Sequence, residues 1–124
     1  MTRKLTEGEC RTAMEHGEFD AQIRQASSMT AIILTQSWCP QWAAVKSYLP
    51  QVEKAAGDAG LPEPALFYVE YDTESWFEQF MTFKENTFNN REVPYVRYYR
   101  NGKFFRDSNF ISLQGFLNRL GIED

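Results

Sequence analysis

The sequence has few residues that bind metals and no long apolar run. It contains one histidine and two cysteines, Cys10 and Cys39, which lie far apart and have different neighbours. This pattern excludes a disulfide framework, and we expect neither a zinc site nor any other metal site. No apolar segment comes close to the length of about 18 residues that a membrane-spanning helix needs. Residues 1–10 show no secretory signal, and Met1 argues against a removed one, so we expect a cytoplasmic, reducing location.

Basic runs are also absent. Thirteen Lys and Arg residues face seventeen Asp and Glu residues, and the formal net charge is −4. An acidic chain without a basic patch is a poor candidate for binding nucleic acid or an anionic membrane, so we expect neither as a partner. The apolar content of 43% excludes a disordered or fibrous chain, and 124 residues suit one domain, 1–124.

The hydrophobic pattern predicts helices that alternate with short strands. Residues 5–27 read as helix with a break at His16 and Gly17, and Thr6 and Glu9 have the spacing of a capping box. The apolar run 31–34 is typical of a strand buried on both faces. Three further helices are expected: one with an apolar stripe from Trp42 to Ala56, one capped by Asp72 or Thr73, and one from Ser112 to Gly121. Three further strands are expected at 65–71, at 95–99, and at 103–106 after the turn Asn101-Gly102.

This order of elements, α-β-α-β-α-β-β-α, predicts the fold class. Strands separated by helices are expected to be parallel, and the last two strands are expected to form an antiparallel hairpin. The prediction is therefore an α/β fold with a central four-stranded mixed β-sheet and helices on both faces.

The chemistry is concentrated where the first buried strand ends. Cys39 stands at the head of a helix, and Pro40 suits the first helical position because its missing N–H costs nothing there. The positive end of the helix dipole favours the thiolate of Cys39. The apolar neighbours Trp38 and Trp42 oppose ionisation, and no cationic side chain lies within six residues of Cys39.

Three motifs in this order resemble those of the thioredoxin-like superfamily over residues 30–121. They are Trp38-Cys39-Pro40-Gln41-Trp42 after a buried strand, Val93-Pro94-Tyr95 at a strand start, and Tyr99-Arg100-Asn101-Gly102-Lys103 at a hairpin. The resemblance implies a thioredoxin-like core at 30–121, with 1–29 as an N-terminal helical extension. It also implies a cis Val93–Pro94 bond beside Cys39, which lets the Val93 backbone pair with an extended peptide. On this basis Cys39 is the candidate catalytic residue, and the candidate substrate-binding residues are Trp38, Pro40, Trp42, Val93, Pro94 and Tyr95.

The departures from the family are equally informative. Dithiol members carry a resolving cysteine where this chain has Trp42, so no intramolecular Cys-x-x-Cys disulfide can form. Thioredoxin has a buried aspartate six residues before its first cysteine, and this chain has Ile33 there. Monothiol glutaredoxins share the single cysteine but carry Cys-Gly-Phe-Ser and an upstream lysine. Neither is present, so a glutathione-bridged iron–sulfur cluster is not expected, and we expect no cofactor.

Two functions follow from the sequence. The first is monothiol thiol–disulfide exchange, in which Cys39 forms a mixed disulfide with a protein or low-molecular-weight substrate and an external thiol resolves it. The second is a non-catalytic protein- or peptide-binding module on the same scaffold. Trp42 could serve either the core or a peptide-binding surface. Cys10 reads as a small buried apolar residue, and Glu70 and Asp72 read as solvated strand-end acids.

Overall fold

Five strands form one mixed sheet in the computed structural model, which describes residues 1–122. Their spatial order is β1-β3-β2-β4-β5. Strands β1 and β2 run parallel to β3, whereas β4 is antiparallel to β2 and β5 is antiparallel to β4. The strands are β1 (Thr2–Lys4), β2 (Met29–Thr35), β3 (Ala65–Glu70), β4 (Tyr95–Arg100) and β5 (Lys103–Ser108).

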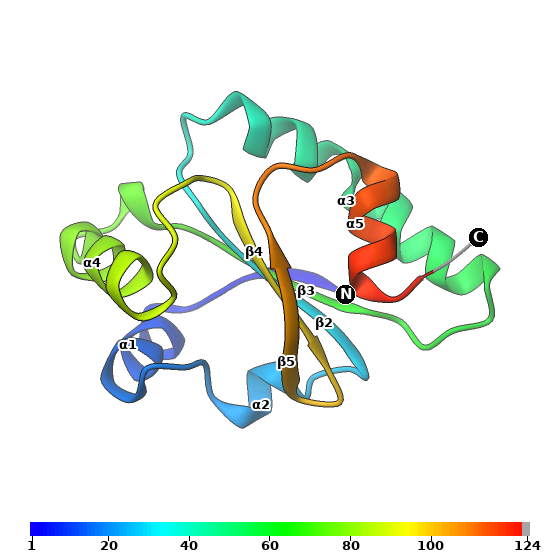
Figure 1. Ribbon diagram of the computed structural model, residues 1–124, viewed down its shortest axis with the longest axis horizontal. Coiled ribbons are helices and arrows are strands. Elements are labelled where there is room, and N and C mark those ends of the chain that lie inside the picture. The colour runs from blue at the N-terminus through cyan, green and yellow to red at the C-terminus, as the bar shows by residue number, and fades with distance from the viewer. Residues whose placement is uncertain (123–124) are drawn as a thin grey trace.

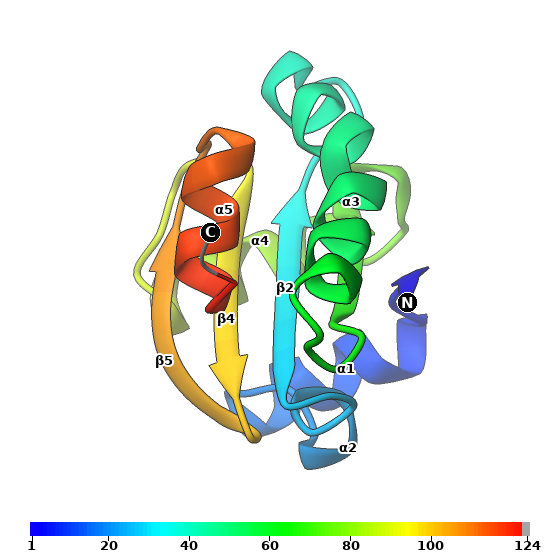
Figure 2. The ribbon, with the colours of Figure 1, turned by 90° about the vertical axis from the view of Figure 1, so that its right-hand side faces the viewer.

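Helices cover both faces of this sheet, as the sequence predicts (Figure 1, Figure 2). They are α1 (Glu7–His16), α2 (Ala21–Arg24), α3 (Pro40–Asp58), α4 (Phe77–Thr87) and α5 (Leu113–Leu120), with a 3₁₀ turn η1 (Tyr71–Thr73). Alternation along β2 divides the core, because Ile32 and Leu34 pack with α1 and α4 while Ala31 and Ile33 pack with α3 and α5. The α/β fold class is therefore confirmed. None of the helices among residues 1–122 is long and apolar enough to cross a membrane.

The N-terminal segment differs from the predicted helical extension. Residues 2–4 form β1, which adds a fifth strand to the predicted four by pairing with β3, and the Leu5 amide continues the pairing to the Tyr68 carbonyl at 2.8 Å. All three residues of β1 are exposed, so no apolar alternation signals the strand. The predicted break at His16 and Gly17 is confirmed, because α1 ends at His16 and Gly17 adopts φ 79°. Beyond the break only the four residues of α2 are helical, so the helical part of this segment is shorter than the predicted 5–27.

The helix before β4 begins later than predicted. Helix α4 starts at Phe77 after Trp76, so neither Asp72 nor Thr73 caps it, and both lie in η1. The Asp72 carboxylate instead accepts hydrogen bonds from the backbone N–H and the hydroxyl of Ser37 (2.7 and 2.6 Å). Asp72 therefore ties the 3₁₀ turn to the loop that carries Cys39.

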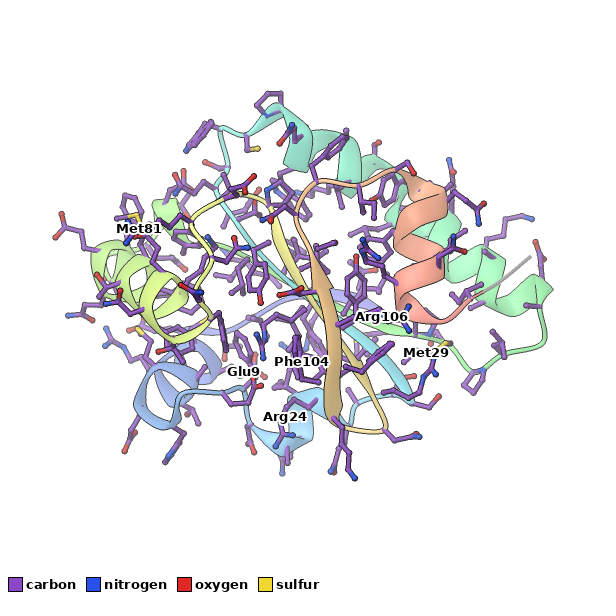
Figure 3. All side chains as sticks on the ribbon, in the orientation of Figure 1. Glu9, Arg24, Met29, Met81, Phe104 and Arg106 are labelled. Carbon is purple, nitrogen blue, oxygen red and sulfur yellow. The ribbon has the colours of Figure 1, made fainter. Side chains whose placement is uncertain are left out.

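An ion pair between the buried Arg97 and the half-buried Glu18 lies on the α1 and α4 face of the sheet. Arg97 lies between the rings of Phe88 and Phe104, 3.8 and 4.0 Å from their centroids, and Figure 3 shows Phe104 on β5. Its Nη2 donates to the carboxylate of Glu18 at 3.0 Å. Nearby, Arg24 of α2 donates to the Gly102 carbonyl in the β4–β5 turn at 2.6 Å. These contacts fasten the segment between α1 and β2 to the hairpin.

Candidate functional site

Cys39 occupies the N-cap position of α3. Its carbonyl accepts from the Ala43 amide at 3.1 Å, and its own amide donates to the Gln36 carbonyl at 3.2 Å. Pro40 is the first residue of the helix, as predicted. The thiol makes no hydrogen bond to the helix backbone and donates instead to the carbonyl of Val93, with Sγ 3.8 Å from the oxygen. The side chain of Cys39 is 4% exposed, so the sulfur lies just beneath the surface.

The segment before β4 forms the opposite wall of the site. The Val93–Pro94 peptide bond is cis, and Val93 is half-buried between the two core layers. Figure 1 shows the loops after β2, before β4 and after β5 at the same end of the molecule. The fold therefore brings Cys39, Val93 and Pro94 together from positions 54 residues apart.

The loop between β2 and α3 supplies the exposed part of the site. Trp38 is 64% exposed, and its Nε1 donates to the side-chain oxygen of Gln36. Pro40 is also exposed. The two bonds from Ser37 to Asp72 fix this loop. Trp38 and Pro40 are thus exposed on either side of Cys39, and their role in binding a substrate stays a prediction.

Trp42 belongs to the core and not to a substrate-binding surface. It is 1% exposed, and its ring lies 5.4 Å from that of Tyr68. Its indole N–H donates to Glu70 Oε2 at 2.7 Å. The prediction of a substrate contact through Trp42 is therefore wrong for its side chain, because position 42 falls on the buried stripe of α3 with Val45 and Leu49.

Tyr95 is also misplaced by the sequence prediction. Its side chain is fully buried among the residues that face α1 and α4, whereas Cys39 packs with the residues that face α3 and α5. Successive strand residues point to opposite faces, so Tyr95 faces away from the layer that contains Val96 and Cys39. Its hydroxyl accepts from Arg97 Nη1 and donates to Asp107, both at 2.9 Å.

Glu70 of the neighbouring strand β3 places a carboxylate on the face of the sheet that also carries Ile33. Ile33 is fully buried beside α3. Glu70 stands opposite Thr35 in the β2–β3 register, and it binds Trp42 rather than acting as a solvated cap. Alternation with Leu66 and Tyr68 along β3 is the sequence signal that places Glu70 on this face.

Cys10 is structural. It is fully buried between α1 and the sheet, and burial raises the pKa of its thiol to about 12, with the charges of Glu9 and Glu74 adding to the effect. Both cysteines are free. Cys10 and Cys39 lie in different core layers, on opposite faces of the sheet. Within residues 1–122 no group of three His, Cys, Asp or Glu side chains is arranged to hold a metal ion.

Solved structures with a similar fold include thioredoxins. Thioredoxin O2 from Arabidopsis thaliana in its oxidized state superposes with a TM-score of 0.65 at 15% identity over 96% of this chain and 93% of its own. Oxidised thioredoxin from Plasmodium falciparum gives 0.61 at 14% identity, covering 96% and 97% of the two chains. Trxlp from Edwardsiella tarda EIB202 gives 0.60 at 16% identity, covering 97% and 98%. No family model matches the sequence, and no curated protein matches it.

Proposed function

We propose that this chain, which has a thioredoxin-like fold, carries out monothiol thiol–disulfide exchange through Cys39. The observation that carries the proposal is the position of Sγ, at the N-terminus of α3 and 3.8 Å from the Val93 carbonyl. The neighbouring Val93 backbone offers an extended peptide a hydrogen-bonding edge beside the sulfur.

The proposed reaction has two exchange steps. In the first, the Cys39 thiolate attacks one sulfur of a substrate disulfide, the substrate S–S bond breaks, and the departing thiolate takes a proton from water. In the second, an external thiolate attacks the substrate sulfur of the mixed disulfide and releases the Cys39 thiolate. The net result transfers the substrate sulfur from one thiol to another, with no change in the oxidation state of the protein.

Trp42 is the reason that the resolving thiol must be external. It fills the position of a resolving cysteine with a buried indole, and Cys10 lies on the other face of the sheet. A dithiol enzyme resolves its mixed disulfide intramolecularly, at a very high effective concentration. An external thiol at millimolar levels resolves it more slowly.

Alkylation of the folded protein by iodoacetamide tests the reactivity of Cys39. We expect Cys39 to react at least about tenfold faster than Cys10 at neutral pH, since burial raises the Cys10 pKa to about 12. Mass spectrometry of wild type and Cys39→Ser assigns each site, and denatured protein provides the control in which the two rates converge. Equal rates in the folded protein would rule out the catalytic proposal.

Insulin reduction tests the monothiol mechanism. We expect no turnover without added thiol, and a rate that rises in proportion to the concentration of glutathione. A dithiol thioredoxin is the positive control. Turnover at a rate close to that of the control would show that Trp42 does not limit the reaction.

A peptide-binding module is the second candidate, and the exposure of Trp38 favours it. Trp38 is 64% exposed and offers a large apolar surface to a partner, whereas the neighbouring Cys39 is only 4% exposed and offers little surface for reaction. In this function Cys39→Ser retains peptide affinity, whereas Trp38→Ala loses it.

We also propose a cytoplasmic, reducing location, supported by the two free cysteines.

A further inference from the structure

A buried lysine lies behind the segment that faces Cys39. Lys84 of α4 is 1% exposed, and its Nζ donates to the Asn90 carbonyl at 2.9 Å. Asn90 begins the short segment that leads to Val93 and Pro94. The ammonium group therefore fixes the segment from the side of α4.

Two asparagine side chains hold the same segment from the side of β5. Asn90 and Asn109 pair through both amides, with Nδ2 to Oδ1 distances of 3.2 and 3.0 Å. Asn109 Nδ2 also donates to the Pro94 carbonyl at 3.2 Å, and the Glu92 amide donates to Asn90 Oδ1 at 3.0 Å. The backbone is thus hydrogen-bonded on both sides of Val93, to Asn90 of the same segment before it and to Asn109 after it.

The surroundings of Lys84 make its charge costly. Glu85 on its own helix and Glu92 in the segment are the carboxylates that act on it, and Arg91 pairs with Glu85 at 3.5 Å. The ring of Tyr95 lies 5.9 Å from Nζ. Burial outweighs both acids and lowers the pKa of Lys84 to about 8. An apolar side chain of similar shape would avoid this cost but would leave the Asn90 carbonyl without its donor.

We propose that Lys84 is a positioning residue for exchange at Cys39, because its ammonium and the Asn90–Asn109 pair hold the Val93 backbone opposite the sulfur. This inference rests on the proposed function. It predicts that the site prefers extended peptide disulfides as substrates, because they align on that backbone, whereas small disulfides do not. Lys84 itself touches neither the sulfur nor the substrate.

The substitution Lys84→Met tests the proposal, and Lys54→Met is the matched control, since Lys54 is an exposed lysine of α3 paired with Asp58. The first measurement compares attack by Cys39 on a short unstructured peptide bearing a mixed disulfide with alkylation by iodoacetamide. We expect Lys84→Met to slow the peptide reaction about tenfold through a higher KM, and to change alkylation less than about twofold. Lys54→Met is expected to change neither. A wild-type ratio of the two rates in Lys84→Met would overturn the proposal.

The pH dependence separates positioning from a purely structural role. In wild type we expect the peptide rate, divided by the alkylation rate, to fall above pH about 8 as Lys84 loses its proton. The same ratio is expected to be flat in Lys84→Met. Parallel profiles in the two proteins would contradict the proposal.

Hydrogen exchange tests the hold on the segment without relying on catalysis. We expect the Glu92 amide, which binds Asn90, to exchange about tenfold faster in Lys84→Met, while the Ile32 amide in β2 exchanges no faster than in wild type. Unchanged exchange at Glu92 would overturn the proposal. Faster exchange at Glu92 in a protein whose wild type forms no mixed disulfide would refute the proposed function and leave the hold of Lys84 on the segment established.

Discussion

Trp42 gives the site its single-cysteine character. Its indole packs against Tyr68, and its N–H satisfies the Glu70 carboxylate. Lys46 lies above both rings, with Nζ 5.9 Å from the Trp42 centroid and 5.3 Å from that of Tyr68. The position that carries a thiol in dithiol enzymes here joins α3 to the end of β3, three residues after Cys39.

Replacing Trp42 by Phe tests this link. Phe keeps most of the ring packing but removes the N–H donor of Glu70, and we expect the free energy of unfolding to fall by about 1–3 kcal/mol. Glu70→Met removes the acceptor, and the double variant is expected to lose less than the sum of the two single variants. Urea unfolding of the four proteins measures the coupling. Strictly additive losses would show that the hydrogen bond contributes nothing to stability.

At the residue scale, prediction succeeded where a motif fixes local geometry. Cys39 and Pro40 take the predicted positions because a strand end and a helix start follow each other directly in the sequence. Trp42 and Tyr95 were misassigned because nearness in sequence to Cys39 or Pro94 does not say which face a side chain takes. The helix stripe and the strand alternation decide those faces.

The start of α1 joins two elements through one carboxylate. Glu9 accepts from both terminal nitrogens of Arg3 on β1, at 2.9 and 2.7 Å, and from the Thr6 amide at 2.8 Å. Thr6 returns the bond by accepting from the Glu9 amide at 3.1 Å, which completes the predicted capping box. The bonds from Arg3 are the main cause that lowers the pKa of Glu9, and the Thr6 amide adds to the effect.

Glu9→Gln is expected to destabilise the protein at neutral pH by about 1 kcal/mol. Because the folded pKa of Glu9 lies below its ordinary value of 4.5, this contribution is present above pH 4.5 and is lost as the pH falls through the folded pKa. Denaturant unfolding at pH 7 and at pH 3 should show the gap between wild type and Glu9→Gln closing at low pH. Glu7→Gln, which breaks only the exposed pair with Arg11, is the control with at most about 0.5 kcal/mol of loss. A gap of equal size at both pH values would contradict this account.

At the element scale, the sequence predicts long apolar segments well and short polar ones poorly. Strand β2 and helix α3 carry enough periodic apolar residues to be recognised, and the turn Asn101-Gly102 locates the hairpin. Strand β1 has three exposed residues, and only its pairing with β3 makes it a strand. The local sequence therefore does not predict β1, because the strand depends on pairing with residues 64 positions away, as Thr2 does with Leu66.

The whole molecule buries two cations on one side of the sheet, the face that α1 and α4 cover. Arg97 and Glu18 pair across 79 residues, and Lys84 supports the loop before β4. Both cations stand in stretches rich in aromatic residues, a pattern that predicts a core and not a buried charge. A single sequence does not reveal which groups bind these two cations, because a charged side chain taken alone is typical of the surface.

The stability of the whole molecule should depend on Lys84 in a way that pH reveals. Its folded pKa of about 8 lies below the ordinary 10.5, so the unfolded chain holds a proton that the folded chain releases between these values. The stability of wild type relative to Lys84→Met should therefore rise with pH across this window and be constant below it. Buried tyrosines act oppositely, because burial raises the pKa of Tyr95 to about 12 and stability falls as the pH climbs above 10.

Both proteins share those tyrosines, so the difference between them isolates the lysine. At pH 7 we expect Lys84→Met to be more stable than wild type by about 1 kcal/mol or more, which corresponds to a gain of about 4 °C in Tm. At pH 10 the advantage should be nearly gone, because Lys84 is then neutral in the folded chain. Urea unfolding at pH 7, 8, 9 and 10 measures this trend. The ammonium of Lys54 is exposed, so the stability difference between wild type and Lys54→Met should not change with pH over this range. A Lys84→Met advantage that stays constant from pH 7 to pH 10 would mean that the buried charge of Lys84 has no part in the stability of the fold.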